Sequence, residues 1–342
     1  MDTIINRQYD IAAGIAAPLE LPRFSTYTIC NLRGGIGKTS LAFNLAYLAG
    51  DVLAVDTCPQ CNLSCFFDNN YAGNNGITAY DMLIPYFVPG LGKTIRGARS
   101  AEATNKFFDG HRAYFIQSDS RLYVLPSQIT TALMQARATL GEQQAAIIDS
   151  MLYSLRDIIS NEMRESGTTK CIIDTSPFFS GATHLAWHAC DAMIVPVRTD
   201  QQSVNSLSLL LRTLSDSHSE FRKMLPTGGH TPKIQMVVLT HGAWSTSAGA
   251  RNKPSRQTRI YLEKVFDIIR QNITHFTTHD PENHLMVLDD FLGTGRVSSV
   301  KSKPIMLLKK GESITENRVK SIVNDAVEKV QAQLSYIHSC LW

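Results

Sequence analysis

The sequence predicts an α/β fold in which a mostly parallel, twisted sheet carries helices on both faces, giving three αβα layers. Three observations lead to this prediction. Short β-branched apolar runs alternate with amphipathic stretches, as they do in parallel βαβ units. Most of the runs are apolar nearly throughout, which is typical of strands buried on both faces. The 342 residues are 44% hydrophobic and 18% charged, and this composition excludes wholesale disorder.

Seven apolar runs are expected to form strands, and five amphipathic stretches between them are expected to form helices. The expected strands span residues 26–31, 52–56, 122–126, 170–174, 192–197, 234–240 and 284–288. The expected helices span residues 38–49, 145–165, 203–215, 256–270 and 315–334. In the last stretch apolar side chains recur at helical spacing, so we expect that helix to pack against the core, with a helix lying on a membrane surface as the alternative.

The domain organisation follows from length and composition. A chain of this length makes one large domain or two small ones, and nothing in the sequence marks a second unit. We therefore expect an N-terminal extension at 1–25 followed by a single domain at 26–342. Residues 87–120 contain Pro, Gly and charged residues of both signs, which indicates an insertion. Residues 241–258 are rich in Gly, Ser and Arg and read as a long loop, which is usually functional or mobile.

The cellular setting is expected to be a reducing cytoplasm. No apolar run approaches the ~18 residues of a membrane-spanning helix. The first ten residues lack the basic start and apolar core of a secretory signal. Seven cysteines are spread along the chain without the close framework of a small disulfide-bonded protein. We expect no membrane association.

The strongest functional signal is the segment 31–40, which reads Asn-Leu-Arg-Gly-Gly-Ile-Gly-Lys-Thr-Ser between an expected strand and an expected helix. Small residues let successive N–H groups turn inward around phosphate oxygens, where the helix also directs its positive end. Lys38 would reach the β- and γ-phosphates of a nucleotide, and Thr39 would bind Mg²⁺. Leu32 departs from the usual P-loop spacing, which places Gly there, so a chance Gly-rich loop is the alternative. The expected phosphate-binding residues are Gly34, Gly35, Ile36, Gly37, Lys38, Thr39 and Ser40.

Two further expected strands end in an aspartate that is followed by a turn. Asp56 ends the run 52–56, and Asp174 ends the run 170–174. A carboxylate at the end of a buried strand beside a P-loop can position a water on Mg²⁺. The alternative for either residue is a helix cap or a turn.

The order and the residues of these segments resemble the motifs of the ParA/MinD family of deviant Walker A P-loop ATPases, and within it those of the ParA branch. The family loop K-G-G-x-G-K-[ST] matches residues 33–39, with Arg33 in place of the leading Lys. The family motif D-x-D-P-Q-x-N matches residues 56–62, which read Asp-Thr-Cys-Pro-Gln-Cys-Asn. The motif I-I-D-T-P-P matches residues 172–177, which read Ile-Ile-Asp-Thr-Ser-Pro. Weaker similarities occur at 77–83, 122–128, 191–200 and 302–307.

The resemblance implies a P-loop NTPase-like fold and a Mg·ATP-dependent switch that forms a homodimer when ATP binds. Such a protein acts in DNA or plasmid partitioning or in cargo positioning, with non-specific DNA and a ParB-like protein as partners. The implied catalytic residues are Lys38, Arg33, Asp56 and Asp174, and the implied magnesium residues are Thr39, Asp56 and Asp174. Arg33 would reach across the dimer to the partner's phosphates; its alternative is pairing with a local carboxylate.

Cys58 stands where the family has the aspartate that orients or activates the attacking water. A thiol is a weak acceptor and a poor base, and losing a water-positioning group typically lowers a rate by ~10²–10⁴. We therefore expect ATP binding with slow hydrolysis. One alternative is a pseudo-ATPase that acts as a regulatory or structural module. Another is a ligase or kinase on the same scaffold, for which the sequence shows no acceptor motif.

Three groups of residues leave their roles open. Cys58, Cys61 and Cys65 have a spacing compatible with a metal site, a redox-sensitive pair or small buried side chains. Thr240 lies in the region expected to read the adenine base, whereas His184, His188 and His241 suggest no role. Eight basic residues are candidates for DNA phosphate contacts, with ordinary solvated charges as the alternative: Arg251, Lys253, Arg256, Arg259, Lys301, Lys303, Lys309 and Lys310.

Overall fold

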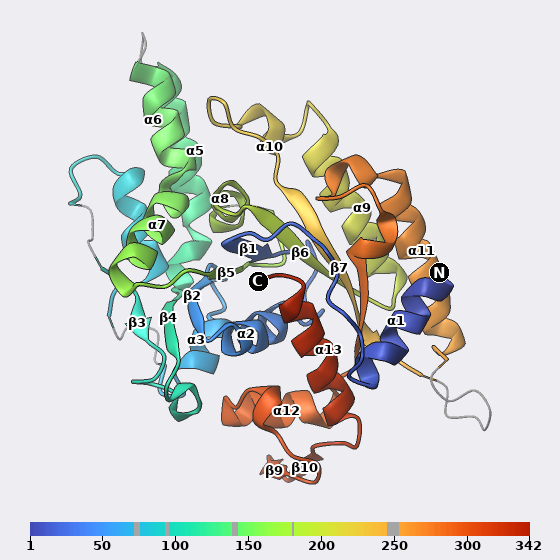
Figure 1. Ribbon diagram of the computed structural model, residues 1–342. Coiled ribbons are helices and arrows are strands. Elements are labelled where there is room, and N and C mark those ends of the chain that lie inside the picture. The colour runs from blue at the N-terminus through green and yellow to red at the C-terminus, as the bar shows by residue number, and fades with distance from the viewer. Residues whose placement is uncertain (72–75, 93–95, 139–142, 180, 245–252) are drawn as a thin grey trace.

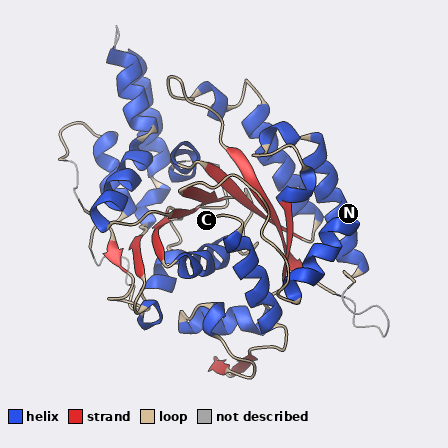
Figure 2. Ribbon diagram, viewed as in Figure 1, coloured by secondary structure: helices blue, strands red, loops and turns tan. Residues whose placement is uncertain are grey.

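In the computed structural model the chain is built around one eight-stranded sheet with helices on both of its faces (Figures 1 and 2). The structure describes residues 1–342 except 72–75, 93–95, 139–142, 180 and 245–252. The strand order is β3-β4-β2-β5-β1-β6-β7-β8. Every neighbouring pair is parallel except β3 and β4, which are antiparallel. The expected three-layer α/β fold is confirmed.

Six of the eight sheet strands overlap expected runs with shifted bounds, whereas β3 and β4 were not expected. The strands are β1 (Thr26–Ile29), β2 (Asp51–Asp56), β3 (Arg99–Ser100), β4 (Arg112–Ile116), β5 (Cys171–Asp174), β6 (Ala192–Arg198), β7 (Lys233–Gly242) and β8 (Leu285–Asp289). A separate antiparallel hairpin consists of β9 (Ser313–Glu316) and β10 (Val319–Ile322).

Thirteen α-helices are described. They are α1 (Asp2–Ala12), α2 (Lys38–Ala49), α3 (Asn62–Phe67), α4 (Ala79–Leu83), α5 (Leu125–Ala138), α6 (Gln143–Leu152), α7 (Ser154–Ser166), α8 (Ala182–Ala189), α9 (Gln201–Ser215), α10 (Glu220–Lys223), α11 (Arg256–Gln271), α12 (Leu292–Lys301) and α13 (Val327–Ser339).

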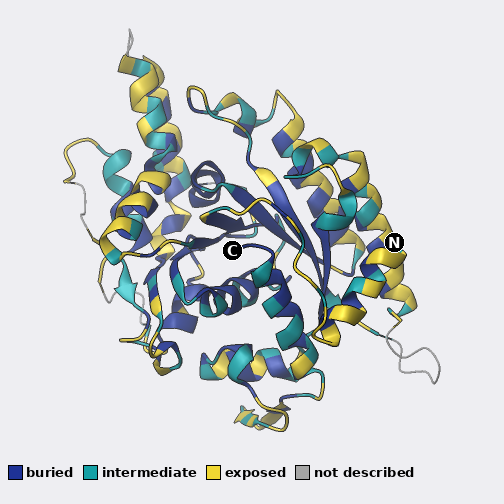
Figure 3. Ribbon diagram, viewed as in Figure 1, coloured by how far each residue is buried: buried dark blue, intermediate teal, exposed yellow. Residues whose placement is uncertain are grey.

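The central strands are buried on both faces, as their continuous apolar runs predict. In β2, Val52 and Ala54 enter the layer formed with α2 and α13, whereas Leu53 and Val55 enter the layer formed with α5, α7 and α8. None of these four side chains is exposed to solvent. On the same face as α5, α7 and α8, helices α9 and α11 cover β6 and β7. Figure 3 shows the sheet and α2 as the most buried part of the molecule.

Three sequence-based expectations are wrong. Residues 122–126 form no strand: a 3₁₀ turn at Ser120–Tyr123 leads into α5, whose buried side chains recur at helical spacing. The expected helix at 315–334 is instead the β9–β10 hairpin followed by α13, because Asn317 and Arg318 adopt left-handed backbone angles that end any helix. The expected helix at 145–165 is divided at Tyr153 into α6 and α7.

Two segments expected outside the main body contribute to it. Residues 87–120, expected as an insertion, supply β3 and β4, and β4 pairs with β2 along its whole length. Within the N-terminal segment, α1 covers the edge strand β8. Its Ile4 enters the layer with α9 and α11, its Ile11 enters the layer with α2 and α13, and Arg7 donates to the Leu285 carbonyl of β8 at 2.7 Å.

Candidate nucleotide-binding site

The expected site residues meet at the carboxyl ends of the central strands. Residues 30–37 form the loop after β1, and β1 lies directly beside β5. β2 lies on the other side of β5, so that Asp56 and Asp174 are partners in the strand register. Ligand sites of open α/β sheets lie at this end of the strands. The topology therefore brings the glycine-rich loop and both carboxylates together.

The glycine-rich loop encloses a cavity of about 190 Å³. Gly35 and Gly37 have φ angles of 70° and 88°, which favour glycine. Gly37 is also the N-cap of α2, so the helix begins at Lys38 with its free N–H groups beside the cavity. All seven residues expected to bind phosphate line the cavity, and the remaining lining residues are Cys58, Gln60, Asn62, Thr175 and Pro177.

Lys38 is buried, and its ammonium group lies against the loop itself. Its Nζ donates to the carbonyl of Arg33 at 2.6 Å and to that of Asn31 at 3.3 Å. Burial lowers the pKa of Lys38, and the negative charge of Asp174 opposes that shift. Phosphate oxygens of a nucleotide in the cavity would compete with the two carbonyls for this ammonium group.

The two aspartates are buried side by side with unequal hydrogen bonding. The Oδ2 atom of Asp56 accepts from the backbone N and the Oγ of Ser64, each at 2.8 Å, and its Oδ1 accepts from the Cys58 N–H at 3.0 Å. Asp174 accepts from Thr39 Oγ1 at 2.7 Å through Oδ2, while its buried Oδ1 has no hydrogen-bond partner within the described residues. Burial raises the pKa of both carboxyls, and the charge of Asp56 raises that of Asp174 further.

This donor set fits Mg²⁺. Buried carboxylates need a compensating positive charge, and the unpartnered oxygen of Asp174 lies beside a hydroxyl at the edge of the phosphate cavity. Mg²⁺ is usually bound in such sites through one or two carboxylates, waters and phosphate oxygens. Thr39, Asp56 and Asp174 are therefore the residues that could hold it.

Arg33 has a local partner. Its guanidinium forms an ion pair with Asp200, the N-cap residue of α9, and also donates to Gln202 Oε1 at 3.2 Å. Within this single chain, the alternative of a local carboxylate is the arrangement observed. The Arg33 side chain is 27% exposed, which leaves it accessible from outside.

Cys58 lies in the cavity wall at the position where the family has its second aspartate. Burial raises the pKa of this thiol to about 12, with smaller contributions in the same direction from Asp56 and Asp174. The side chain is therefore neutral near pH 7. A neutral thiol is a poor base toward water.

Two residues that support the site were not expected from the sequence in these roles. Ser64 holds Asp56 through two hydrogen bonds, and its Oγ also accepts from the Ser118 N–H at 2.8 Å. Thr240, which lies in the region expected to read the adenine base, donates from Oγ1 to the carbonyl of Ile36 at 3.1 Å and so supports the glycine-rich loop. The one sequence signal for the first role is that Ser64 follows the end of the 56–62 motif by two residues.

The other open groups show little sign of binding sites. No group of three or more His, Cys, Asp or Glu residues is placed to hold a metal within the described part of the chain, the three spaced cysteines included. Of the basic candidates, Arg251 lies outside the described residues, and four others form ion pairs: Arg259 with Glu263, Lys301 and Lys303 with Glu312, and Lys310 with Asp325. None of the described helices is long and apolar enough to span a membrane.

Comparisons with known proteins give one matching family and several similar proteins. The profile of a family described as an AAA domain matches residues 25–227. The chromosome partitioning protein ParA of Caulobacter vibrioides is 25% identical over 251 residues, covering 72% of this chain and 80% of that protein. The ATP complex of an McdA variant from Cyanothece has a TM-score of 0.56 at 19% identity, covering 83% of this chain and 89% of that one. A plasmid partition protein of Borrelia burgdorferi bound to AMPPNP has a TM-score of 0.54 at 15% identity, covering 92% and 98%.

Proposed function

Because the chain belongs to the ParA/MinD family of P-loop ATPases, we propose that it is a Mg·ATP-dependent switch that dimerises on binding ATP and acts in DNA partitioning or cargo positioning. One observation carries the proposal. The glycine-rich loop lines one cavity, and Thr39 in the cavity wall donates to Asp174, which lies beside Asp56 in the strand register. The other oxygen of the buried Asp174 carboxylate has no hydrogen-bond partner within the described residues.

Each site residue has a defined task in this proposal. The backbone N–H groups of residues 34–40 and the ammonium of Lys38 bind the phosphates. Thr39, Asp56 and Asp174 would hold Mg²⁺, Thr39 directly and the two carboxylates through water. When bound, Mg²⁺ neutralises charge on the phosphate oxygens. The chain's own groups orient the triphosphate and exclude water from it.

The biological setting is proposed from the relatives. The Caulobacter protein is named for chromosome partitioning, and the Borrelia structure is that of a plasmid partition protein with an ATP analogue. We therefore propose a partitioning role in which the dimer interacts with non-specific DNA and with a ParB-like protein. The local ion pairs of Arg259, Lys301, Lys303 and Lys310 weaken the case for those four residues as DNA contacts.

A pseudo-ATPase is the second candidate, and Cys58 favours it. The thiol occupies the family's water-orienting position and stays neutral because of its burial. Hydrolysis is therefore expected to be slow, and an ATP-bound dimer that turns over rarely would act as a regulatory or structural module. The rate of hydrolysis relative to the lifetime of the dimer decides between the two candidates.

Calorimetry with Mg·ATP tests the proposal. We expect the protein to bind Mg·ATP, and we expect Lys38→Ala to lose most of that binding. Sizing of the protein without nucleotide, with ADP and with Mg·ATP is expected to show a dimer only with Mg·ATP. Absence of binding heat at millimolar Mg·ATP would contradict the proposed function.

A further inference from the structure

A second cavity lies between α5, α8 and α10. Its volume is about 380 Å³, within the range of about 300–1,000 Å³ that is typical of small-molecule sites. Among the described residues, it shares no lining residue with the phosphate cavity. The segment after β5 borders both cavities: Thr175 and Pro177 line the phosphate cavity, whereas Phe179 and Gly181 line the second one. The second cavity is therefore a separate site.

Helix α5 supplies one wall of this cavity. Its lining residues recur every three or four positions and so share one face of the helix. They are Pro126, Ile129, Thr130, Leu133, Met134 and Arg137. Phe179 and Met224 add apolar side chains from the other walls. The body of the cavity is therefore suited to an apolar ligand group.

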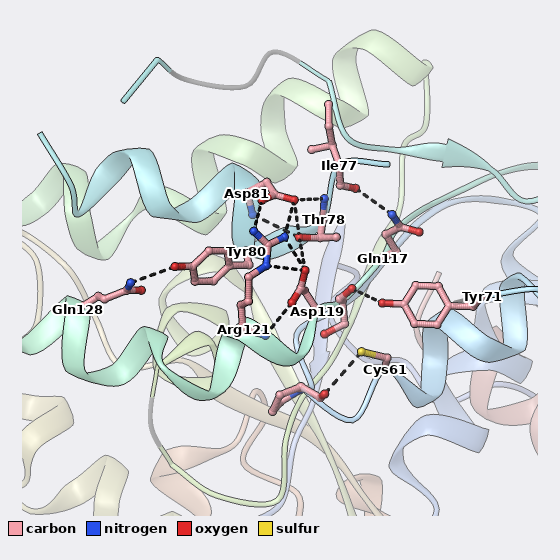
Figure 4. Close-up of polar contacts among 12 residues, drawn as sticks. Cys61, Tyr71, Ile77, Thr78, Tyr80, Asp81, Gln117, Asp119, Arg121 and Gln128 are labelled. Carbon is pink, nitrogen blue, oxygen red and sulfur yellow. Dashed lines mark hydrogen bonds and ion pairs between the residues drawn. The ribbon is translucent and has the colours of Figure 1, made fainter. Parts of the chain in front are cut away.

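Hydrogen bonds and an ion pair outside the cavity hold the start of α5 in place. Gln128 Nε2 donates to Tyr80 Oη of α4 at 2.9 Å (Figure 4). The guanidinium of Arg121, just before α5, lies 4.7 Å from the centroid of the Tyr80 ring. It also forms an ion pair with Asp81 at 2.8 Å and donates from Nε to Asp119 at 2.8 Å. The α5 wall therefore has its own supports.

The remaining walls are packed as closely. Gly181, the N-cap of α8, has a φ angle of 51°, and a Cβ atom there would lie only 3.0 Å from Pro126 Cγ. The buried ring of Phe221 in α10 stacks on His188 of α8, with centroids 4.7 Å apart. The cavity is therefore formed without a ligand, as most small-molecule sites are.

The charged lining residues favour an anion. Arg137 of α5 and Lys223 of α10 are cations, and Glu220 of α10 is the one anion among the described lining residues, which leaves a net charge of +1. All three side chains are exposed, and none forms an ion pair within the described part of the chain. A ligand carboxylate would therefore meet two cations that have no competing partner.

His184 adds a buried polar group to the lining. It is 5% exposed, and its Nε2 atom has no hydrogen-bond partner within the described residues. Such an unpartnered group is uncommon in a protein interior. Burial lowers the pKa of His184 to about 4, so the imidazole is neutral near pH 7. The charge of the lining thus lies with its exposed residues, and its buried part is uncharged.

We propose that this cavity binds a small apolar carboxylate, whose hydrocarbon part lies against α5 and Phe179 and whose carboxylate pairs with Arg137 and Lys223. A guanidinium and a carboxylate can form two parallel hydrogen bonds. Exposed ion pairs contribute little to affinity, so the apolar part supplies most of the binding. The charges then select among ligands of the same shape. Nucleotide binding is not required for this site.

Naphthylacetate is the probe, and naphthylethanol and naphthylethylamine are the neutral and cationic ligands of matching shape. The full chain, isotopically labelled at the methyl groups of its ten methionines, is titrated without nucleotide and followed by NMR. We expect saturable shifts of the Met134 and Met224 signals, assigned from Met134→Leu and Met224→Leu. Met306, which packs in the layer of α2 and α13, should not shift. The expected Kd is ~0.1–1 mM for a ligand of this size.

Two sets of variants test the ligand class and its place. Wild type should prefer the acid over the alcohol by about two- to fivefold. The double variant Arg137→Gln, Lys223→Gln should lose that preference, and Glu220→Gln should increase it. Thr130→Trp should block the cavity and abolish binding. Thr131→Trp is the matched control: both threonines are exposed and donate to the carbonyl four residues earlier at 2.9 Å, but Thr131 does not line the cavity.

Each contrary result overturns a stated part of the proposal. Absence of saturable shifts at Met134 and Met224 overturns the site. Equal affinity of wild type for the acid, the alcohol and the amine overturns the ligand class. Equal binding by Thr130→Trp and Thr131→Trp overturns the placement of the ligand. Calorimetry of the same protein with Mg·ATP measures the proposed function separately, so failure of one proposal is not mistaken for failure of the other.

Discussion

The carboxylates of Asp56 and Asp174 are both buried. Asp56 is stabilised by three hydrogen bonds, whereas Asp174 has one oxygen without a partner in the described chain. An unsatisfied buried charge costs free energy unless a cation compensates it. At the residue scale, the site is therefore destabilising in the absence of Mg²⁺, and its occupation relieves that cost.

Replacing Asp174 with Asn is expected to raise stability while it weakens binding. Removing the buried charge should raise the free energy of unfolding at pH 7.5 by roughly 1 kcal/mol or more in Mg²⁺-free buffer. The same change should lower the affinity for Mg·ATP by roughly 10–100-fold. Thermal unfolding and calorimetry measure the two effects. Asp289→Asn is the control, because Asp289 is paired with Lys329 and its replacement should only destabilise.

The same carboxyls set the pH dependence of the metal-free protein. Their pKa values are raised in the folded state by burial and, for Asp174, by the charge of Asp56. The folded protein therefore binds more protons than the unfolded chain above the ordinary Asp pKa of about 4, so this contribution to stability falls as pH rises from there. Unfolding measured from pH 4.5 to 7.5 should show this fall, and it should be smaller in Asp174→Asn. An equal fall in both proteins would contradict it.

Cys58→Asp is expected to raise the rate of ATP hydrolysis. The new carboxylate would stand in the cavity wall, where it can accept a proton from the attacking water. General-base groups contribute ~10²–10⁴ in rate, so an increase of about 10²-fold is within reach. Single-turnover hydrolysis measures it. Cys58→Asn is the matched control of similar shape and should stay slow; a fast wild type that neither change alters would show that Cys58 does not limit the reaction.

At the scale of elements, local patterns predicted the central strands and missed segments whose structure depends on distant contacts. β2, β5, β6 and β7 are apolar along their length because both faces are covered, and that pattern is visible in the sequence. β4 mixes exposed Arg112 with buried Phe115 and lies next to the edge, so its pattern is weaker. The β9–β10 hairpin carries apolar residues at spacings that also fit a helix, and it is the left-handed turn at Asn317 and Arg318 with the antiparallel pairing around it that distinguishes the two.

Helix α1 closes the β8 edge of the sheet, and Ile4 is its most buried apolar contact with the layer of α9 and α11. Ile4→Ala is expected to lower the free energy of unfolding by about 2–5 kcal/mol, since a buried Ile is truncated. Binding of Mg·ATP should be unchanged, because α1 does not line the cavity. Denaturant unfolding measures the effect. Ile15→Ala, at a side chain that is 74% exposed, should change stability by less than about 0.5 kcal/mol.

At the scale of the whole molecule, the sheet order determines which sequence motifs become neighbours. The segments 31–40, 56–62 and 172–177 are far apart in the chain, yet each lies at the carboxyl end of one of the three adjacent strands β1, β2 and β5. Motif order and the rule for parallel sheets were enough to predict that they meet. The supports Ser64 and Thr240 could not be predicted in the same way, because each acts through a hydrogen bond to a backbone or side-chain atom that only the folded arrangement brings near.

Substitution of Arg33 tests the proposed ATP-dependent dimer. It lies beside the phosphate loop, is partly exposed and is paired with Asp200 in the single chain. A forked guanidinium suits phosphate as well as carboxylate, so a partner's bound nucleotide could replace Asp200. Arg33→Ala is then expected to keep Mg·ATP binding within about threefold in the monomer and to lose the dimer. Light scattering with Mg·ATP measures the dimer, and calorimetry measures binding.

Arg33→Lys is the matched variant for that experiment, since Lys is the residue the family loop carries. It restores the positive charge without the fork, so it should recover most of the ATP-dependent dimer. Gln202→Ala removes only the weaker local contact of Arg33 and should dimerise as the wild type does. If Arg33→Ala dimerised as fully as wild type, Arg33 would be a local partner of Asp200 and nothing more. If it lost Mg·ATP binding in the monomer, the ion pair would be supporting the loop within one chain, and the interaction across the dimer would have to be assigned to another residue.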